Sequence, residues 1–215
     1  MFDDLDHLIL SDPFAKSSHQ PALQLKEGER REVCILFADC HGFTALSEHL
    51  DHEVVHTLMD KLMQLFTARI KHYGGFIDKY EGDMVMALFG AKVASEQDTE
   101  RAVEAGLQML AVMNQFDRAL EKRLGRELDL GVRIGINTGE VTTGKVGEKR
   151  EGDFTVMGDP VNLASRMESN APLNRIMMPV ATMRRVEQAF EFEAHGNIQV
   201  KGKAEPIEVW LVKGI

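Results

Sequence analysis

Apolar residues recur at every third or fourth position along two stretches of the chain, and this spacing predicts two long amphipathic helices. The first covers residues 44–72 and ends at a pair of glycines, and the second covers about residues 96–123. Two shorter helices are expected, at residues 158–169, where Pro160 suits a first helical turn, and at residues 180–189. The pattern therefore predicts that most of the helical content lies in the two long segments.

Short runs rich in β-branched and aromatic residues, bounded by turn formers, predict strands between these helices. They are expected at residues 33–38, 76–80, 84–89, 128–137, 140–145, 154–157, 176–179, 190–200 and 205–212. Turns are expected at Glu81–Gly82–Asp83 and at Thr138–Gly139. The order β-α-β-β-α-β is that of ferredoxin-like sheets. We therefore expect an α/β (α+β) fold in which the long helices cover one face of a mixed sheet and leave another face or an edge for a ligand or partner.

The bulk composition narrows the class of protein. The chain has 215 residues, 44% of them hydrophobic, which suits one large soluble domain. Its net charge of −9 argues against a general nucleic-acid binder, because such proteins neutralise phosphates with a basic face. Cys34 and Cys40 form no zinc pattern, so we expect buried free thiols in a reducing compartment.

The first residues favour a cytoplasmic protein. The chain opens with MFDDLDHLIL, which is acidic and unlike a signal peptide, and no run approaches the roughly 18 apolar residues of a membrane span. Residues 1–28 are rich in turn formers and are expected to be a linker or disordered arm. Residues 29–215 are then expected to form one domain.

Two aspartates at the ends of apolar runs are the first candidates for chemistry. Asp39 ends the run in ILFADCHGFT, and Asp83 lies in a turn between two predicted strands. If the strands are neighbours, the carboxylates converge at one edge of the sheet, where hard divalent cations find oxygen ligands. A pair of such ions, about 3.5–4 Å apart, assists phosphoryl displacement. The alternative interpretation is a helix cap at Asp39 and a turn filler at Asp83.

Polar residues elsewhere are ambiguous when taken singly. Asn162 and Arg166 lie four apart on a predicted helix, so they share a face and could bind ribose and phosphate oxygens, although a solvated polar stripe is the alternative. Lys79 lies on a strand close before the acidic turn, and Lys201 and Lys203 flank a glycine at a hairpin bend. Taken alone, Lys79 is more typical of a surface lysine than of a ligand, and Lys201 and Lys203 favour neither interpretation.

The segment GEVTTGKV, residues 139–146, nearly matches a phosphate-binding P-loop. Val146 stands where the motif needs a hydroxyl for magnesium. The following residues, GEKREGD, have a loop composition, whereas a P-loop leads into a helix N-terminus. We therefore reject a P-loop enzyme.

Taken together, these segments resemble the catalytic domain of class III nucleotide cyclases, the adenylate and guanylate cyclase family. The match is colinear from about Arg31 to Ile215, through FADCHGFT, DKYEGD, GINTGEV, TVMGDPVNLASRME and VKGKAEP. The resemblance implies a palm-like domain that acts as a head-to-tail homodimer and converts ATP to cyclic AMP and pyrophosphate. It also implies two divalent ions per site, Mg²⁺ or Mn²⁺, and leaves room for a regulatory domain outside this chain.

The resemblance assigns the acidic end of the site. Asp39 and Asp83 match the two metal-binding aspartates, and the backbone at Cys40 would complete the metal shell. Gly42, Phe43 and Thr44 match the loop whose amides hold the triphosphate.

The resemblance also assigns the cationic surface that would face this end from the other subunit. Asn162 and Arg166 match the residues that orient the ribose and stabilise charge at the reacting phosphate. Lys201 matches the triphosphate lysine best, with Lys203 as the alternative after a small register shift.

Lys79 and Thr155 match the pair that selects the base. A lysine donates to adenine N1, and a threonine hydroxyl can accept from adenine N6, so the pair favours ATP over GTP. The alternatives to an adenylate cyclase are a guanylate cyclase and a nucleotide-binding regulatory domain without turnover. A cyclic-dinucleotide synthase is disfavoured, because EGDM is not the turn such enzymes need.

Overall fold

The structure is a computed structural model that describes residue 13 and residues 28–145 and 154–213. Almost all of the arm predicted at residues 1–28 lies outside the described residues. None of the helices in the described ranges has the length and apolar composition needed to span a membrane.

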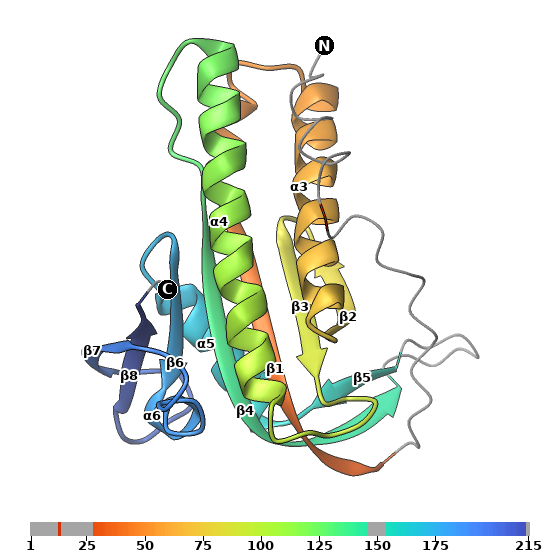
Figure 1. Cartoon of the computed structure of the whole chain (residues 1–215), viewed down its shortest axis with the longest axis vertical. Coiled ribbons are helices and arrows are strands. Elements are labelled where there is room, and N and C mark those ends of the chain that lie inside the picture. Colours follow the sequence, from red (N-terminus) through yellow and green to blue (C-terminus); the bar gives the residue numbers. More distant parts are fainter. Residues whose placement is uncertain (1–12, 14–27, 146–153, 214–215) are drawn as a thin grey trace.

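A mixed sheet forms the centre of the described part of the chain (Figure 1). Its strands run in the order β2-β3-β1-β4-β6-β8-β7, with β5 paired to β4. Only β4 and β6 pair in parallel among the described strands, and the order β2-β3-β1-β4 is the ferredoxin-like arrangement that the sequence predicts. The strands are β1 (Arg30–His41), β2 (Phe76–Glu81), β3 (Met84–Phe89), β4 (Gly131–Lys145), β5 (Phe154–Met157), β6 (Arg175–Pro179), β7 (Phe192–Ile198) and β8 (Ile207–Val212).

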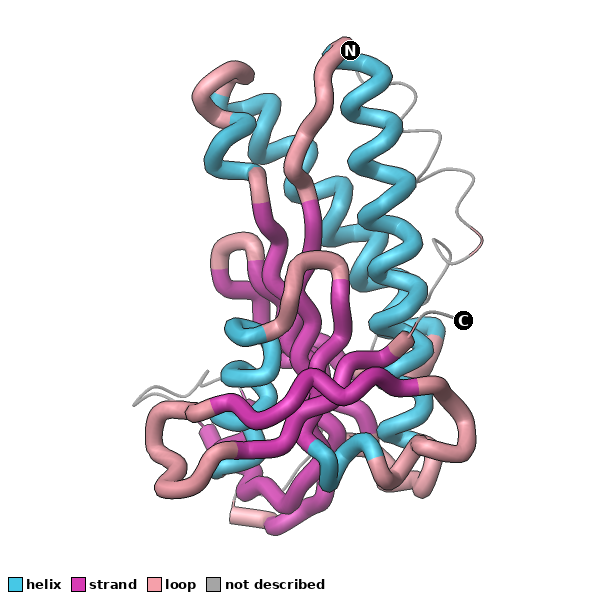
Figure 2. Tube along the Cα trace, turned by 90° about the vertical axis from the view of Figure 1, so that its left-hand side faces the viewer, coloured by secondary structure: helices cyan, strands magenta, loops and turns pink. Residues whose placement is uncertain are grey.

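Helices cover both faces of this sheet. The long helices α3 (His52–His72) and α4 (Asp98–Leu124) lie on one face, and α5 (Asp159–Asn170) lies on the other (Figures 1 and 2). Two short helices, α2 (Phe43–Leu46) and α6 (Val180–Met183), follow β1 and β6. The prediction that the long helices share one face is confirmed.

Strand β1 divides the core between the two faces, because successive strand residues point to opposite sides. Cys34, Leu36 and Ala38 belong to the cluster that packs under α3 and α4. Val33, Ile35 and Phe37 belong to a second cluster, which includes Ala164 of α5. Asp39 continues this second series, so the alternation directs it toward the face that carries α5.

Contact between α5 and β4 depends on a glycine. A side chain at Gly135 would place its Cβ 2.1 Å from the backbone nitrogen of Glu168 and 2.4 Å from the carbonyl oxygen of Ala164. Glycine therefore lets the helix backbone lie directly on the strand, and this fixes the position of the side chains that α5 carries.

The first predicted helix is interrupted, which corrects its expected extent of 44–72. Helix α2 ends at Leu46, and α3 starts only after Asp51. Asp51 has an extended conformation (φ −58°, ψ 141°), and its carbonyl accepts the first N–H groups of α3, from Val54 and Val55. The apolar spacing continues across the break because Leu50 still packs against the core, so periodicity alone conceals it.

The predicted turn at Thr138–Gly139 is also wrong, because β4 runs without a break and pairs with β1 from Gly131 to Thr142. Gly139 instead allows close approach of Pro160, whose Cγ would lie 2.7 Å from a Cβ at this position. The helix predicted at 180–189 ends at Met183, since the next hydrogen bonds span three residues and form a series of turns.

Candidate active site

Asp39 and Asp83 meet at one end of the sheet. Asp39 pairs across the ladder with Met84, and the N–H of Cys40 donates to the carbonyl oxygen of Asp83 at 3.1 Å. Burial raises the pKa of Asp39, and the negative charge of Asp83 and a hydrogen bond with its carboxyl raise it further. The structure therefore brings together the two carboxylates that the sequence singles out.

The pair fits a divalent cation by the chemistry of its donors. Carboxylate oxygens are hard ligands, and a cation between them would relieve the repulsion that contributes to the raised pKa of Asp39. Within the described ranges, no group of three or more His, Cys, Asp or Glu side chains is arranged to hold a metal. Any ion at this end would therefore depend on the two aspartates together with backbone and substrate oxygens.

The loop after Asp39 is held tightly against the rest of the domain. Gly42 has a φ of 94°, and a Cβ there would lie 2.4 Å from the carbonyl oxygen of Asp129. Phe43 is buried and its ring lies 6.4 Å from that of Phe116, whereas Thr44 is exposed. Phe43 therefore anchors the loop in the core, and Thr44 is presented at the surface.

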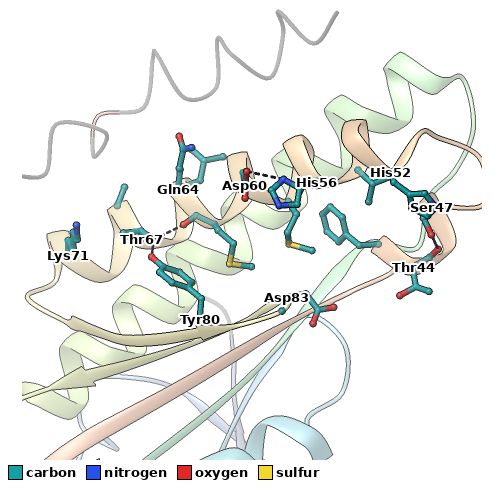
Figure 3. Close-up of a pocket in the computed structure, with 17 residues that line it drawn as sticks. Thr44, Ser47, His52, His56, Asp60, Gln64, Thr67, Lys71, Tyr80 and Asp83 are labelled. Atoms are coloured by element: carbon teal, nitrogen blue, oxygen red, sulfur yellow. Dashed lines mark hydrogen bonds and ion pairs between the residues drawn. The ribbon is translucent and has the colours of Figure 1, made fainter. Parts of the chain in front are cut away.

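A groove of about 1000 Å³ opens beside Asp83, between α3 and β2 (Figure 3). Thr44 and Asp83 lie toward one end of it, and Lys71 and Tyr80 toward the other. Apolar side chains contribute part of the lining, among them Val55, Met59 and Met63 of α3.

The second set of predicted residues lies on β2, β5 and α5. Lys79 is exposed on β2, where the ladder with β3 is irregular between Ile77 and Lys79. The hydroxyl of Thr155, on β5, lies 2.8 Å from the carboxylate of Asp78. This hydrogen bond places Thr155 beside the residue that precedes Lys79, although β2 and β5 are not neighbours in the sheet.

Asn162 and Arg166 are exposed on α5, one turn apart. The opposite side of the helix is buried through Ala164 and Met167. The amide of Asn137 donates to the carbonyl oxygen of Pro160 at 3.0 Å, which ties the first turn of α5 to β4. The polar pair is thus presented outward from a helix that is fixed on its other side.

The two candidate lysines of the β7–β8 turn differ in their contacts. Lys203 donates to the carboxylate of Asp159 at 2.6 Å, so it links this turn to the start of α5. Lys201 is exposed and has no ion-pair partner among the described residues. The structure therefore leaves Lys201 available for a ligand and engages Lys203 within the chain.

Three charged residues near the candidate site were missed by sequence reasoning. Arg133 lies opposite Asp39 in the β1–β4 ladder, and its charge opposes the rise in the pKa of Asp39. Glu168 is buried, and burial together with the charge of Asp39 raises its pKa to about 6. Asp78 contacts Thr155. In the sequence, each of these residues is a charged residue within or beside an apolar or motif-bearing segment. Their proximity to the candidate site becomes visible only from tertiary contacts.

Comparison with known proteins agrees with this architecture. The sequence profile of the family described as "Adenylate and Guanylate cyclase catalytic domain" matches residues 25–214. "Adenylate cyclase 1" of Rhizobium meliloti (strain 1021) is 29% identical over 191 residues, which cover 86% of this chain but only 28% of that protein. The chain thus spans less than a third of the length of this relative.

Two solved structures share the fold closely. The adenylyl cyclase CyaB from P. aeruginosa is 33% identical, with 88% of this chain and 97% of that chain covered and a TM-score of 0.83. The guanylyl cyclase Cya2 is also 33% identical, with coverages of 88% and 95% and a TM-score of 0.80. The chain therefore belongs to the adenylate and guanylate cyclase catalytic domain family, the class III nucleotide cyclases.

Proposed function

We propose that this chain is an adenylate cyclase that converts ATP to 3′,5′-cyclic AMP and pyrophosphate. The observation that carries the proposal is the meeting of Asp39 and Asp83 at one end of the sheet, where Asp83 and the exposed Thr44 also line a groove. We also propose that residues 29–215 form the catalytic domain, that it works in the cytoplasm, and that any regulatory domain lies outside this chain.

The acidic pair is proposed to hold two divalent ions, Mg²⁺ or Mn²⁺, with the backbone at Cys40 completing the shell. Such ions, when bound, lower the pKa of the ribose 3′-hydroxyl and neutralise the triphosphate. The backbone amides of Gly42, Phe43 and Thr44 then bind the phosphates. Lys201, which has no ion-pair partner among the described residues, adds a positive charge for the same phosphates.

Two residues of α5 are proposed to assist the reaction itself. The ribose 3′-hydroxyl loses its proton to solvent, and its oxygen bonds to the α-phosphorus in line while the bond from that phosphorus to the departing pyrophosphate oxygen breaks. Arg166 meets the negative charge that develops in the transition state, where a positioned donor contributes about 3 kcal/mol. Asn162 holds the ribose in the geometry of attack. The fixed inner side of α5 supports this role, because it fixes the backbone positions from which both side chains extend.

A head-to-tail homodimer is proposed to complete each site. The carboxylates and the loop of one subunit would face Lys79, Thr155, Asn162, Arg166 and Lys201 of its twin. The groove beside Asp83 supports this arrangement, because its partly apolar lining suits contact with a second protein surface better than contact with water.

Recognition of adenine is proposed to rest on Lys79 and Thr155. Lysine donates to N1, and the hydroxyl accepts from the N6 amino group. A guanylate cyclase is the second candidate, because the similar solved structure Cya2 is described as a guanylyl cyclase.

The direct test is to incubate the purified chain with ATP or GTP, and with Mg²⁺ or Mn²⁺, and to quantify cyclic nucleotide by chromatography. We expect at least tenfold more cyclic AMP than cyclic GMP, and no product of either kind with excess EDTA. Faster turnover of GTP would establish the second candidate. Tight binding of ATP without product, under conditions where a known cyclase turns over, would indicate a regulatory domain.

A further inference from the structure

A hydrogen bond between Thr155 and Asp78 connects the two strands that carry the proposed base-recognition residues, β2 with Lys79 and β5 with Thr155. Thr155 Oγ1 lies 2.8 Å from Asp78 Oδ2, and both side chains are partly buried. The partners are 77 residues apart, on strands that do not pair with each other. Asp78 falls where the β2–β3 register shifts and immediately precedes Lys79. One carboxylate is therefore bonded to Thr155 and adjacent along the chain to Lys79.

We propose that Asp78 is a specificity-determining positioning residue, which holds the Thr155 hydroxyl as a hydrogen-bond acceptor toward the base. A hydroxyl has one proton and two lone pairs, whereas an ionised carboxylate can only accept. The single proton of Thr155 is therefore directed at Asp78, and only lone pairs remain for a ligand. The inference rests on the proposed role of Thr155 in base recognition.

The consequence for the choice of base follows from the edges of the two purines. Adenine presents an amino group at C6, which donates to a lone pair of Thr155. Guanine presents a carbonyl oxygen at C6, which would face the same lone pair without a proton between them. Threonine alone can donate or accept, and so does not discriminate by itself. Asp78 removes this freedom and leaves only the orientation that suits adenine.

The main test is Asp78→Asn. The asparagine amide can donate to Thr155 Oγ1, which frees the hydroxyl proton to turn toward guanine O6. We expect the ratio of kcat/KM for ATP to that for GTP to fall about tenfold, since unmatched polar groups in a binding site are what gives such discrimination. Asp78→Ala, which only frees the hydroxyl, should lower the ratio less, and it carries the test if the asparagine variant fails to fold.

Two further variants separate this role from a structural one. In a Thr155→Val background, which keeps the shape but lacks the hydroxyl, Asp78→Asn should leave the ATP-to-GTP ratio unchanged. Glu187→Gln removes one carboxylate from an exposed turn after α6 and serves as the charge control, with the wild-type ratio expected. Thermal unfolding followed by circular dichroism confirms that each variant is folded.

The outcomes distinguish this inference from the proposed function. An unchanged ratio in both folded Asp78 variants, or an equal fall with and without the Thr155 hydroxyl, overturns the role of Asp78 while ATP cyclisation stands. A wild-type chain that makes no cyclic nucleotide overturns the proposed function instead. The ratio of ATP to GTP affinities, measured by calorimetry on the same variants, then decides the role of Asp78.

Discussion

The side chain of Asp39 carries an unfavourable charge in the absence of a cation. Burial is the main cause of its raised pKa, and Asp83 adds to it. Because the ionised form is disfavoured in the folded state, this group stabilises the fold at low pH, and that contribution is lost as pH rises through the raised pKa. Above that pKa the ionised acidic pair therefore favours cation binding at the expense of metal-free stability.

Replacement of Asp39 by asparagine tests this account with two readouts. We expect at least a 100-fold loss of cyclase activity, because a metal ligand is removed. In EDTA at pH 7 the variant should unfold at the same temperature as wild type or a few degrees higher, since the disfavoured charge is gone. Millimolar Mn²⁺ should raise the unfolding temperature of wild type but not that of the variant. Retained turnover, or an equal Mn²⁺ effect in both proteins, would contradict the assignment.

Site residues that lie at the ends of predicted strands could be identified from the sequence. Residues that reach the site only through contacts between distant parts of the chain could not. Asp39 and Asp83 follow and precede apolar strands, so neighbouring strands suffice to bring them together. Asp78 acquires its hydrogen bond only because the fold brings Thr155 of β5 within reach of β2, and no periodicity predicts a contact between strands that do not pair. The roles of all these side chains stay predictions.

At the scale of elements, α5 is the part that the sheet positions most closely. Gly135 lets its backbone lie on β4, and Asn137 ties its first turn to the same strand. The buried Thr182 hydroxyl donates to Asn137 Oδ1 at 3.0 Å and accepts from the N–H of Thr138 at 3.1 Å, so this connection is itself held in place. The orientation of Asn162 and Arg166 thus depends on groups that would never touch the substrate.

The substitution Gly135→Ala tests whether the positions of Asn162 and Arg166 depend on the close contact between α5 and β4. The new methyl group meets helix backbone at 2.1 Å, which cannot rotate away, so α5 must shift. We expect a loss of about 2 kcal/mol in unfolding free energy and a fall in kcat larger than the change in ATP affinity. Gly106→Ala on α4 is the matched control, because its Cβ meets side chains and no backbone, the nearest atom being the end of the Ile176 side chain at 2.9 Å. A Gly135 variant with normal kcat would show that α5 tolerates displacement.

Predictions of whole elements succeed where one local signal dominates and fail where tertiary packing decides. Strands 84–89 and 154–157 are found within their predicted bounds. Thr138–Gly139 has the composition of a turn, yet both residues lie within one long strand. Glycine at position 139 instead leaves room for Pro160. Similarly, the break before α3 is hidden, because Leu50 packs against the core and continues the apolar spacing.

At the scale of the whole molecule, the proposed dimer makes each chain a contributor to two sites. The exposed Arg166 and the pair Asp39 and Asp83 would then belong to different sites of the same assembly. A homodimer in which both chains carry the same defect would lose both sites, whereas a heterodimer of two different defects would keep one site intact.

Mixing the Asp39→Ala and Arg166→Ala proteins tests this arrangement. Each variant alone should be essentially inactive, and an equimolar mixture should recover about a quarter of wild-type activity, because half of the dimers are mixed and each has one complete site. Mixing two Asp39→Ala preparations, one of them freshly purified, is the control and should recover nothing. No recovery in a mixture shown by cross-linking to contain heterodimers would rule out sites shared between subunits.

The backbone bond from Cys40 to Asp83 has a consequence for how such an enzyme is switched on. It joins the acidic turn to the end of a central strand, so this portion of the proposed catalytic site is assembled before any nucleotide arrives. An activating signal is therefore not expected to act by ordering that portion. What it can change is the approach of one subunit to its twin, so control is expected to act on quaternary geometry.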